Sequence, residues 1–284
     1  MNLPNGIVDA HVHYWDPSLL SYGWLKELPS LKRPFLPGDY SKASAHAGVG
    51  KILFVESGCD PSRSLDEVDW VTSLALLEPR IHGIVANAPL ELGAGVQEHL
   101  SRLAERPLVK GVRRLLQGES EADYCLRPGF LEGIGLLEEF GFTMDLCIRH
   151  EQLEAVTELV RQVPGVRFIL DHFGKPAVKR GELEPWRSQL CEFAKLPNVT
   201  CKVSGLTTEA HWERWTSDDL KPYFDAVLES FGVDRVIFAG DWPVCTLATE
   251  YQRWVKTVAE LTSSLSAEDA VKLFRSNAER IYRI

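Results

Sequence analysis

Short apolar runs alternate with longer amphipathic runs along almost the whole chain. The short runs are nearly continuous in Val, Ile, Leu and Phe, as is typical of strands in a parallel sheet that is covered on both faces. This pattern predicts eight strands, at Ile7 to Ala10, Ile52 to Val55, Ile81 to Ala86, Val109 to Leu116, Thr143 to Ile148, Arg167 to Leu170, Val199 to Val203 and Val236 to Phe238.

The longer runs place apolar residues three and four positions apart, which is the period of an amphipathic helix. They predict helices at Leu65 to Leu77, Val96 to Leu103, Phe130 to Phe140, Leu153 to Val163, Trp186 to Phe193, Leu220 to Phe231 and Tyr251 to Leu261. Gly141 and Gly232 follow two of these helices, where a left-handed residue commonly ends a helix. Ser217-Asp218-Asp219 is a start signal for the helix from Leu220, and Ser266 is placed to cap a final helix.

Repeated alternation of strand and helix predicts an α/β protein with a parallel sheet. A closed barrel and an open, doubly wound sheet both fit this pattern. Eight units in 284 residues favour a (β/α)8 TIM barrel, which typically needs about 250 residues, and we expect one domain over residues 1–284. No G-x-G-x-x-G follows the first strand, which argues against a dinucleotide-binding fold. The segment from Tyr14 to about Lys42 is expected to form an irregular loop over the mouth of the barrel.

The composition is that of an ordinary globular protein, and the net charge of −9 argues against a general affinity for nucleic acid or for an anionic membrane surface. The six cysteines form no C-x-x-C pair, and no apolar stretch reaches the roughly 18 residues of a membrane span. The N-terminal sequence lacks the basic and apolar regions of a signal peptide. These features predict a cytoplasmic protein with reduced, mostly buried thiols, and they leave its oligomeric state open.

Candidate chemistry begins at the end of the first predicted strand, which runs from Asp9 through His11 to His13. Side chains two positions apart in a strand share a face, so His11 and His13 are expected to project together. Two imidazoles at this spacing can chelate one divalent metal or hold a substrate oxygen directly. Taken alone, the pair fits a loop without function equally well.

Two other predicted strands end in polar residues, which in a barrel point towards its active face. The sixth runs into Asp171, His172 and Lys175. His172 is expected to polarise a carbonyl or transfer a proton, and Lys175 to hold an anion or a carbonyl oxygen. The eighth runs into Asp241. Burying an aspartate there costs free energy unless it is paired, metal-bound or in use, so we assign Asp241 as the general base that activates water. The structural alternatives are a His172 held by Asp171 and an Asp241 that caps the following turn.

Further candidates lie at the remaining strand ends and in the loops beyond them. Glu56 ends the second strand, and Arg113 and Arg114 end the fourth, where alternation lets only one of the two arginines face the barrel interior. Arginine is suited to holding a carbonyl oxygen or a carboxylate, and both arginines are candidates for substrate binding. Weaker candidates are Asp145, Lys202 and Ser204. Tryptophans near predicted loops, on which sugars often stack, are Trp15, Trp24, Trp212, Trp215 and Trp242, of which Trp24 and Trp242 are expected to contact the substrate.

Five segments together resemble the lactonase branch of the amidohydrolase superfamily. They are D-A-H-V-H at 9–13, G-V-R-R at 111–114, L-D-H-F-G-K-P at 170–176, C-K-V-S-G-L at 201–206 and F-A-G-D-W-P-V at 238–244. Each motif is short, but their order and spacing on successive strands make the set specific, and the resemblance spans nearly the whole chain. The stretch from Glu182 to Val244 is most similar to the sugar-lactone members of the branch.

The resemblance implies a distorted (β/α)8 barrel, hydrolysis of a lactone, and a site lined by His11, His13 and His172 with its base at Asp241. The predicted function is the opening of a sugar lactone, such as L-fucono- or L-rhamnono-lactone, to the aldonic acid. Asp241 takes a proton from the attacking water, while His172, an arginine or a metal polarises the carbonyl.

The resemblance also bears on metals. Many amidohydrolases bind two metals through a carboxylated lysine on the fourth strand and a histidine on the fifth, but this chain has arginines and Asp145 there, so two metals are not expected. Some members of the branch resemble metal-independent enzymes and others hold one zinc, and both possibilities remain open. We favour one divalent ion, zinc first, on His11, His13, Asp241 and Glu56.

Alternative functions follow from the same residues. The nearest is hydrolysis of an acidic, aromatic-derived lactone of the pyrone-dicarboxylate or muconolactone type, whose carboxylates Arg113, Arg114 and Lys175 could bind. The many tryptophans favour a neutral polyol instead. A metal-dependent decarboxylase and a binding module without catalysis are more remote alternatives.

Overall fold

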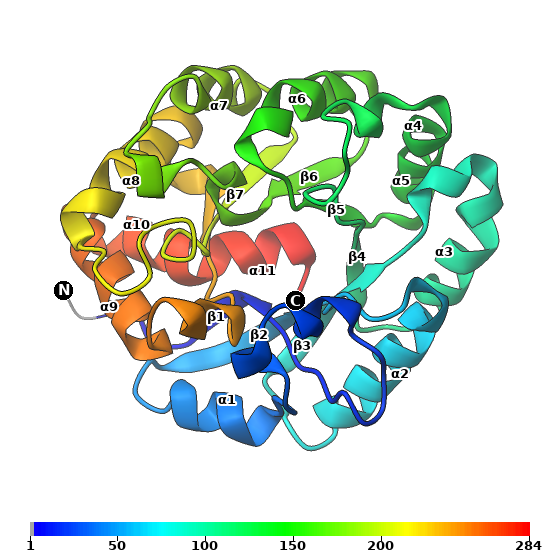
Figure 1. Ribbon diagram of the computed structural model, residues 1–284, viewed down its shortest axis with the longest axis horizontal. Coiled ribbons are helices and arrows are strands. Elements are labelled where there is room, and N and C mark those ends of the chain that lie inside the picture. Colours follow the sequence, from blue (N-terminus) through cyan, green and yellow to red (C-terminus); the bar gives the residue numbers. More distant parts are fainter. Residues whose placement is uncertain (1–2) are drawn as a thin grey trace.

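The computed structural model describes residues 3–284 as a ring of strands with helices around it (Figure 1). The eight strands are parallel and pair in chain order, which confirms the predicted (β/α)8 TIM barrel. They are β1 (Ile7–Val12), β2 (Val49–Val55), β3 (Ile81–Asn87), β4 (Val109–Arg113), β5 (Thr143–Leu146), β6 (Arg167–Leu170), β7 (Val199–Val203) and β8 (Val236–Phe238). The fourth and fifth strands are shorter than predicted, because Leu116 N and Gln117 N leave the ladder and both donate to Cys147 O.

Each predicted helix except that from Phe130 to Phe140 forms within a few residues of its expected bounds. The helices are α1 (Pro37–Ala43), α2 (Ser64–Ala75), α3 (Gln97–Ala104), α4 (Pro128–Gly135), α5 (Leu137–Phe140), α6 (Leu153–Gln162), α7 (Trp186–Ala194), α8 (Ser217–Phe231), α9 (Tyr251–Leu261), α10 (Ala267–Val271) and α11 (Asn277–Tyr282). Gly141 and Gly232 have φ of +65° and +67°, and Ser266 caps α10 by accepting from Asp269 N. The cap of α8 is Thr216 rather than Ser217.

Two of the predictions about elements were wrong. The helix predicted from Phe130 to Phe140 is divided between α4 and α5. The segment expected to be an irregular loop up to Lys42 contains α1. This helix starts because Pro37 occupies its first turn and the Asp39 carboxylate accepts from Leu36 N at 3.2 Å.

The barrel is distorted at the seam between β1 and β8, where isolated contacts replace a regular ladder. Asp241 N donates to His11 O at 2.8 Å, and His13 N donates to Trp242 O at 2.7 Å. One bridge joins Val12 to Trp242. These contacts place the end of β1 directly beside the turn that follows β8.

A buried carboxylate, Asp9, adds a hydrogen bond across this seam and accepts three others. Asp9 Oδ1 accepts from His11 N at 3.1 Å and from Gly240 N at 2.7 Å. Its other oxygen accepts from the hydroxyls of Tyr40 and Tyr251, both at 2.8 Å. Four donors thus satisfy a charge that would otherwise be costly to bury.

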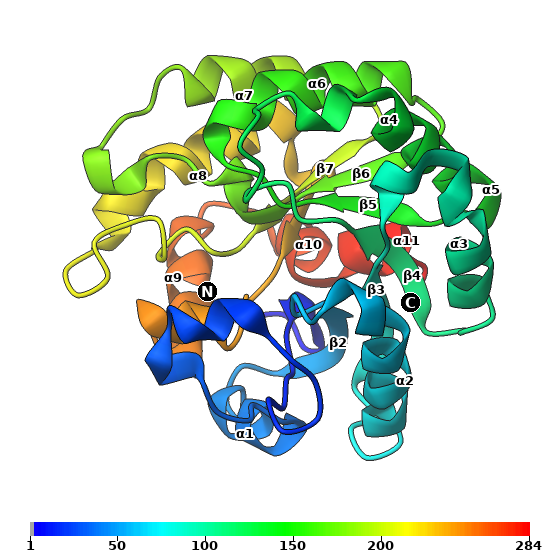
Figure 2. The ribbon, with the colours of Figure 1, turned by 45° about the vertical axis from the view of Figure 1, so that its right-hand side comes forward.

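The opposite, amino-terminal end of the barrel is covered by the C-terminal helix. Ala278, Ile281 and Tyr282 of α11 pack against apolar residues that point into the barrel, and Figures 1 and 2 show α11 crossing the middle of the ring. Lys51 near the start of β2 donates to the carbonyl of Ile284 at 3.1 Å. Since this end is blocked, the cavity of the barrel opens at the carboxyl ends of the strands.

Two predictions from composition can also be compared with residues 3–284. All six cysteines are free thiols and five of them are buried, with Cys191 exposed. No helix in this range combines the length and the apolar character needed to cross a bilayer.

Candidate active site

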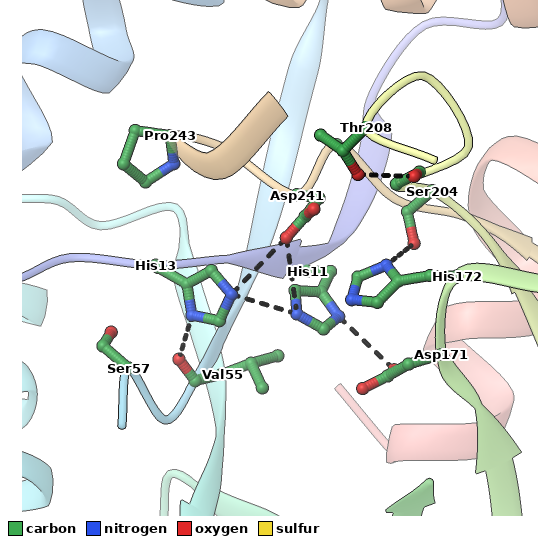
Figure 3. Close-up of polar contacts among 12 residues, drawn as sticks. His11, His13, Val55, Ser57, Asp171, His172, Ser204, Thr208, Asp241 and Pro243 are labelled. Atoms are coloured by element: carbon green, nitrogen blue, oxygen red, sulfur yellow. Dashed lines mark hydrogen bonds and ion pairs between the residues drawn. The ribbon is translucent and has the colours of Figure 1, made fainter. Parts of the chain in front are cut away.

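Three electron-pair donors from β1 and from the turn after β8 converge at the carboxyl end of the barrel (Figure 3). His11 Nε2 lies 3.1 Å from His13 Nε2 and 3.8 Å from Asp241 Oδ1. His13 Nε2 lies 3.5 Å from the same carboxylate oxygen. All three side chains are buried. The distorted seam therefore brings together three of the residues that the sequence suggested as metal ligands.

The three donor atoms fit a single divalent ion. Ligands of a tetrahedral zinc ion lie about 3.3–3.5 Å apart, given zinc–ligand bonds of about 2.0–2.2 Å, and the measured separations bracket this value. His13 Nδ1 donates to Val55 O at 2.8 Å, which leaves Nε2 as the ring nitrogen that faces His11 and Asp241. His172 offers another ligand atom near His11 and Asp241. Imidazole and carboxylate donors of this kind suit zinc.

The turns after β6 and β8 hold their polar residues in an unusual backbone conformation. His172 and Asp241 both have φ of +54°, in the left-handed region that few residues other than glycine adopt. His172 Nδ1 lies 2.8 Å from Ser204 Oγ. Gly205 packs so closely on this ring that a Cβ there would lie 2.7 Å from His172 Nδ1. Backbone strain of about 1–3 kcal/mol per residue is typical of functional sites, and here it directs both side chains inward.

Burial and neighbouring charges determine the protonation of the two candidate catalytic groups. Burial lowers the pKa of His172 to about 4, although Asp241 and Asp171 act in the opposite direction, so the ring is neutral at neutral pH. Burial raises the pKa of Asp241, but His172, His13 and His11 lower it by more, and the net pKa lies below the ordinary value. Asp241 is therefore an ionised acceptor beside a neutral imidazole.

Paired charges lie directly beneath the histidines and are called the ion-pair layer below. Its members are Glu56, Arg113, Asp145, Asp171 and Lys202, all buried. Arg113 Nε donates to Glu56 Oε1 at 2.7 Å, and its Nη1 lies 3.4 Å from Asp171 Oδ2. Lys202 Nζ lies 3.0 Å from Asp171 Oδ1 and also donates to Asp145. Each buried carboxylate of the layer thus has a cationic partner, as burial of charge requires.

A cavity of about 1020 Å³ opens above this arrangement, and His13, His172 and Asp241 lie in its lining. Most of the residues that line it are polar or charged, and two tryptophans, Trp24 and Trp212, line it as well. Trp24 is oriented by a 2.8 Å hydrogen bond from its Nε1 to Ser57 O. A cavity of this volume, with polar groups and aromatic faces in its lining, has the features of a small-molecule site.

The predicted cations all lie along the cavity, but each is already paired. Lys175 donates to Gln117 and lies 3.9 Å from Glu209. Arg114 lies 3.1 Å from Glu91 and 2.8 Å from Glu119. As alternation required, Arg113 points into the barrel whereas Arg114 turns to the rim.

Two sequence predictions conflict with the observed contacts. Glu56 was expected among the metal ligands, but its carboxylate accepts from Arg113 and from Gly58 N, so Arg113 already occupies one of its oxygens and Gly58 the other. Trp242 was expected to contact the substrate, but it is 3% exposed, packs against Tyr40 and Phe35, and does not line the cavity. Trp15 and Trp215 are likewise buried.

Sequence reasoning missed three groups near the site. Asp9 was quoted only as part of a motif, although it shares a strand with His11 at a spacing of two and is therefore on the same face. Cys147 lines the cavity just beyond β5. Tyr282 donates to Asp145 at 2.9 Å from the far end of the chain. For Tyr282 no local pattern gave a signal, because its partner is 137 residues away.

Comparison with known proteins places this site in a family. The profile of the amidohydrolase family matches residues 8–284. An L-fucono-1,5-lactonase of Burkholderia multivorans is 30% identical over 98% of this chain and 96% of its own length. The corresponding lactonase of Burkholderia ambifaria is 28% identical over 98% and 95%. A crystal structure of an amidohydrolase from Burkholderia multivorans with bound zinc has a TM-score of 0.88 at 29% identity, covering 98% of this chain and 99% of that one.

Proposed function

The chain belongs to the amidohydrolase family, and we propose that it opens a sugar lactone, such as L-fucono- or L-rhamnono-lactone, to the corresponding aldonic acid. The observation that carries this proposal is the convergence of His11, His13 and Asp241 at the base of a cavity lined by polar side chains and two tryptophans. Relatives similar over almost their whole length are L-fucono-1,5-lactonases, which supports lactone hydrolysis over other amidohydrolase chemistry.

In the proposed reaction Asp241 accepts a proton from water as that water attacks the lactone carbonyl. Its low pKa keeps it ionised, and the imidazoles beside it orient the carboxylate. His172 faces the same space (Figure 3). With Ser204 donating to Nδ1, the His172 proton lies on Nε2, where it can stabilise the oxyanion of the tetrahedral intermediate. When that intermediate collapses, Asp241 returns the proton to the departing ring oxygen.

A divalent ion, where present, would be held by His11, His13 and Asp241. Bound there, it supplies Lewis acidity towards the carbonyl oxygen. The residues of this chain otherwise orient the water, bind the polyol and carry the proton.

The pairing of three of the four cations that line the cavity favours a neutral sugar over a carboxylated lactone, while the fourth, Arg149, donates to Gln117 O and has no carboxylate partner among the described residues. A dicarboxylate substrate requires unpaired cations, but Arg113, Arg114 and Lys175 are each engaged with carboxylate or amide groups of this chain. The same lining holds the amide side chains of Asn87 and Gln117, each of which keeps one amide group that bonds no residue of this chain, and it also holds Trp24. These groups are suited to hydrogen bonding and stacking with a polyol ring.

The test is a pH-indicator hydrolysis assay of the purified chain on a panel of aldonolactones and of pyrone and muconolactone acids, with and without chelator. Because lactones also open spontaneously, the Asp241→Asn variant serves as the blank. Acid release above that blank from L-fucono-, L-galactono- or L-rhamnono-lactone is the expected result. Release only from the carboxylated lactones, or from none of the panel, overturns the proposal.

A further inference from the structure

A second cavity of about 680 Å³ adjoins the cavity of the candidate active site. It lies among the loops that follow β5, β6 and β7, at the same end of the barrel. The residues that line both cavities are Arg149, Lys175, Thr208, Glu209 and Trp212. The second cavity is therefore the immediate neighbour of the place where a lactone would be opened.

The two cavities differ in the sign of their charge. Five lysine and arginine side chains and three glutamates line the second cavity, which leaves an excess of two positive charges. Four such cations and six carboxylates, Asp241 among them, line the first cavity, which leaves an excess of two negative charges. A divalent ion on the histidines would bring the first balance to zero, which is still less positive than the second. This contrast arises in a chain whose overall net charge is −9.

Two cations that line only the second cavity have no carboxylate partner. Lys179 N donates to Glu209 O at 2.9 Å, which fixes its backbone beside the shared wall, but its ammonium group makes no ion pair or hydrogen bond within residues 3–284. Arg214 Nη2 donates to His211 Nε2 at 3.2 Å and pairs with no carboxylate in the same range. Both side chains are exposed. Unpaired cations of this kind are suited to a carboxylate ligand.

The shared wall adds a third cation between the two cavities. Arg149 Nε donates to Gln117 O at 3.2 Å, and its guanidinium group has no carboxylate partner in the described part of the chain. The other two charged groups of the wall, Lys175 and Glu209, lie 3.9 Å apart and offset one another. The boundary between the cavities therefore carries one net positive charge.

Lactone hydrolysis changes the charge of the ligand. Water adds to the carbonyl, the bond to the ring oxygen breaks, and the resulting carboxylic acid loses its proton at neutral pH. A neutral ring thus becomes an aldonate anion. The charge balance of the cavities hardly acts on the neutral substrate, whereas it repels the anionic product from the first cavity and attracts it to the second.

We propose that the second cavity binds the aldonate product through Lys179, Arg214 and Arg149 as it leaves the active-site cavity. The three cations hold the carboxylate, and Thr208 and His150 in the lining are able to bond its hydroxyl groups. The inference rests on the proposed lactone hydrolysis and adds to it a product site beside the substrate cavity. Because the two sites are separate, a lactone and an aldonate can be bound at once.

Reversal of the two cations that line only the second cavity tests the proposal. Lys179→Glu with Arg214→Glu turns the positive excess of its lining into a negative one. We expect the Kd of L-fuconate, measured by isothermal titration calorimetry, to rise at least about tenfold. The matched control, Arg161→Glu with Lys256→Glu, changes the net charge equally on exposed side chains outside both linings, and its Kd should stay within about twofold of the wild type.

The pattern of product inhibition is a second measurement, and it needs no variant to fold. In the wild type, added L-fuconate should lower kcat for the lactone as well as raise KM, because it binds beside the lactone rather than only in its place. In the reversal variant, shown to be folded by circular dichroism, the effect on kcat should disappear.

Three results overturn the inference and leave the lactonase proposal standing if a sugar lactone is turned over. They are purely competitive inhibition of the wild type by L-fuconate, no binding of L-fuconate to the wild type, and an equal Kd in the reversal variant and its control. The opposite combination is distinguishable from these. Binding of L-fuconate that the reversal variant loses, with silence on every lactone of the panel, supports the carboxylate site and overturns the lactonase proposal.

Discussion

The histidines above the ion-pair layer, His11, His13 and His172, form a histidine layer. The two layers are only one residue apart along the chain at Asp171 and His172, yet they differ in how completely their polar groups are satisfied. Below, Arg113 and Lys202 are bonded to carboxylates on more than one side and have no contact with solvent or only a trace. Above, His13 and His172 face the cavity. Chemistry is therefore expected in the upper layer, where electron pairs remain available, while the lower layer holds the side chains in place.

The sharpest test of this difference is Asp241→Asn. Asparagine tolerates the left-handed backbone at this position, where φ is +54°, so the fold should be retained. Removal of the base should lower kcat on the best lactone by about a thousandfold or more, which corresponds to about 4 kcal/mol in the barrier. Steady-state kinetics measure the loss of kcat, and the midpoint of thermal unfolding shows whether the variant is folded. Near-normal turnover would remove Asp241 from the mechanism.

The lower layer should respond in stability rather than in chemistry. Arg113→Met leaves Glu56 and Asp171 buried with one cationic partner fewer. We expect a loss of about 3–4 kcal/mol in the free energy of unfolding, measured by urea denaturation. An unchanged midpoint of urea denaturation would mean that pairing within the ion-pair layer contributes no net stability.

Glu67 provides the contrasting case of a buried carboxyl without a bonded cation. It is 1% exposed and accepts from Ser57 N at 3.2 Å, and burial, assisted by Glu56, raises its pKa to about 8. The folded chain therefore keeps Glu67 protonated where the unfolded chain has ionised it, so stability present below about pH 4.5 is lost as the pH rises through about 8.

The variant Glu67→Gln removes this dependence while retaining the bond from Ser57. As the pH rises from 5 to 7, the wild type should lose about 2–3 kcal/mol in the free energy of unfolding that the variant does not lose. Urea denaturation at both pH values measures this difference. Parallel stability curves for the two proteins would show that Glu67 is ionised in the fold.

The smallest effect is expected at the rim. Arg114 adjoins Arg113 in sequence, but its side chain is about one-fifth exposed and pairs with Glu91 and Glu119. Arg114→Met should cost less than about 1 kcal/mol, because partly solvated ion pairs contribute little. It is the matched control for Arg113→Met in the same denaturation experiment. A loss as large as that of Arg113→Met would erase the distinction between layer and rim.

Local patterns in the sequence were enough to place the strands and helices. Short continuous apolar runs distinguish the strands from helices with an apolar period of about three and a half, and the spacing of His11 and His13 puts both on one face at the end of β1. The position of Asp241 at the end of an apolar strand likewise needs no tertiary information. Each of these inferences depends on neighbours within a few residues.

The tertiary structure alone decided which charges pair and which remain available. Glu56 looked like a ligand until Arg113, 57 residues away, was found bonded to it, and Trp242 looked exposed until the segment carrying Tyr40 was found packed on it. Lys202 meets His11 across 191 residues. A hydrogen bond or ion pair is set by the distance and direction between atoms, and where distant strands meet around a barrel those quantities depend on how every strand is registered against its neighbours.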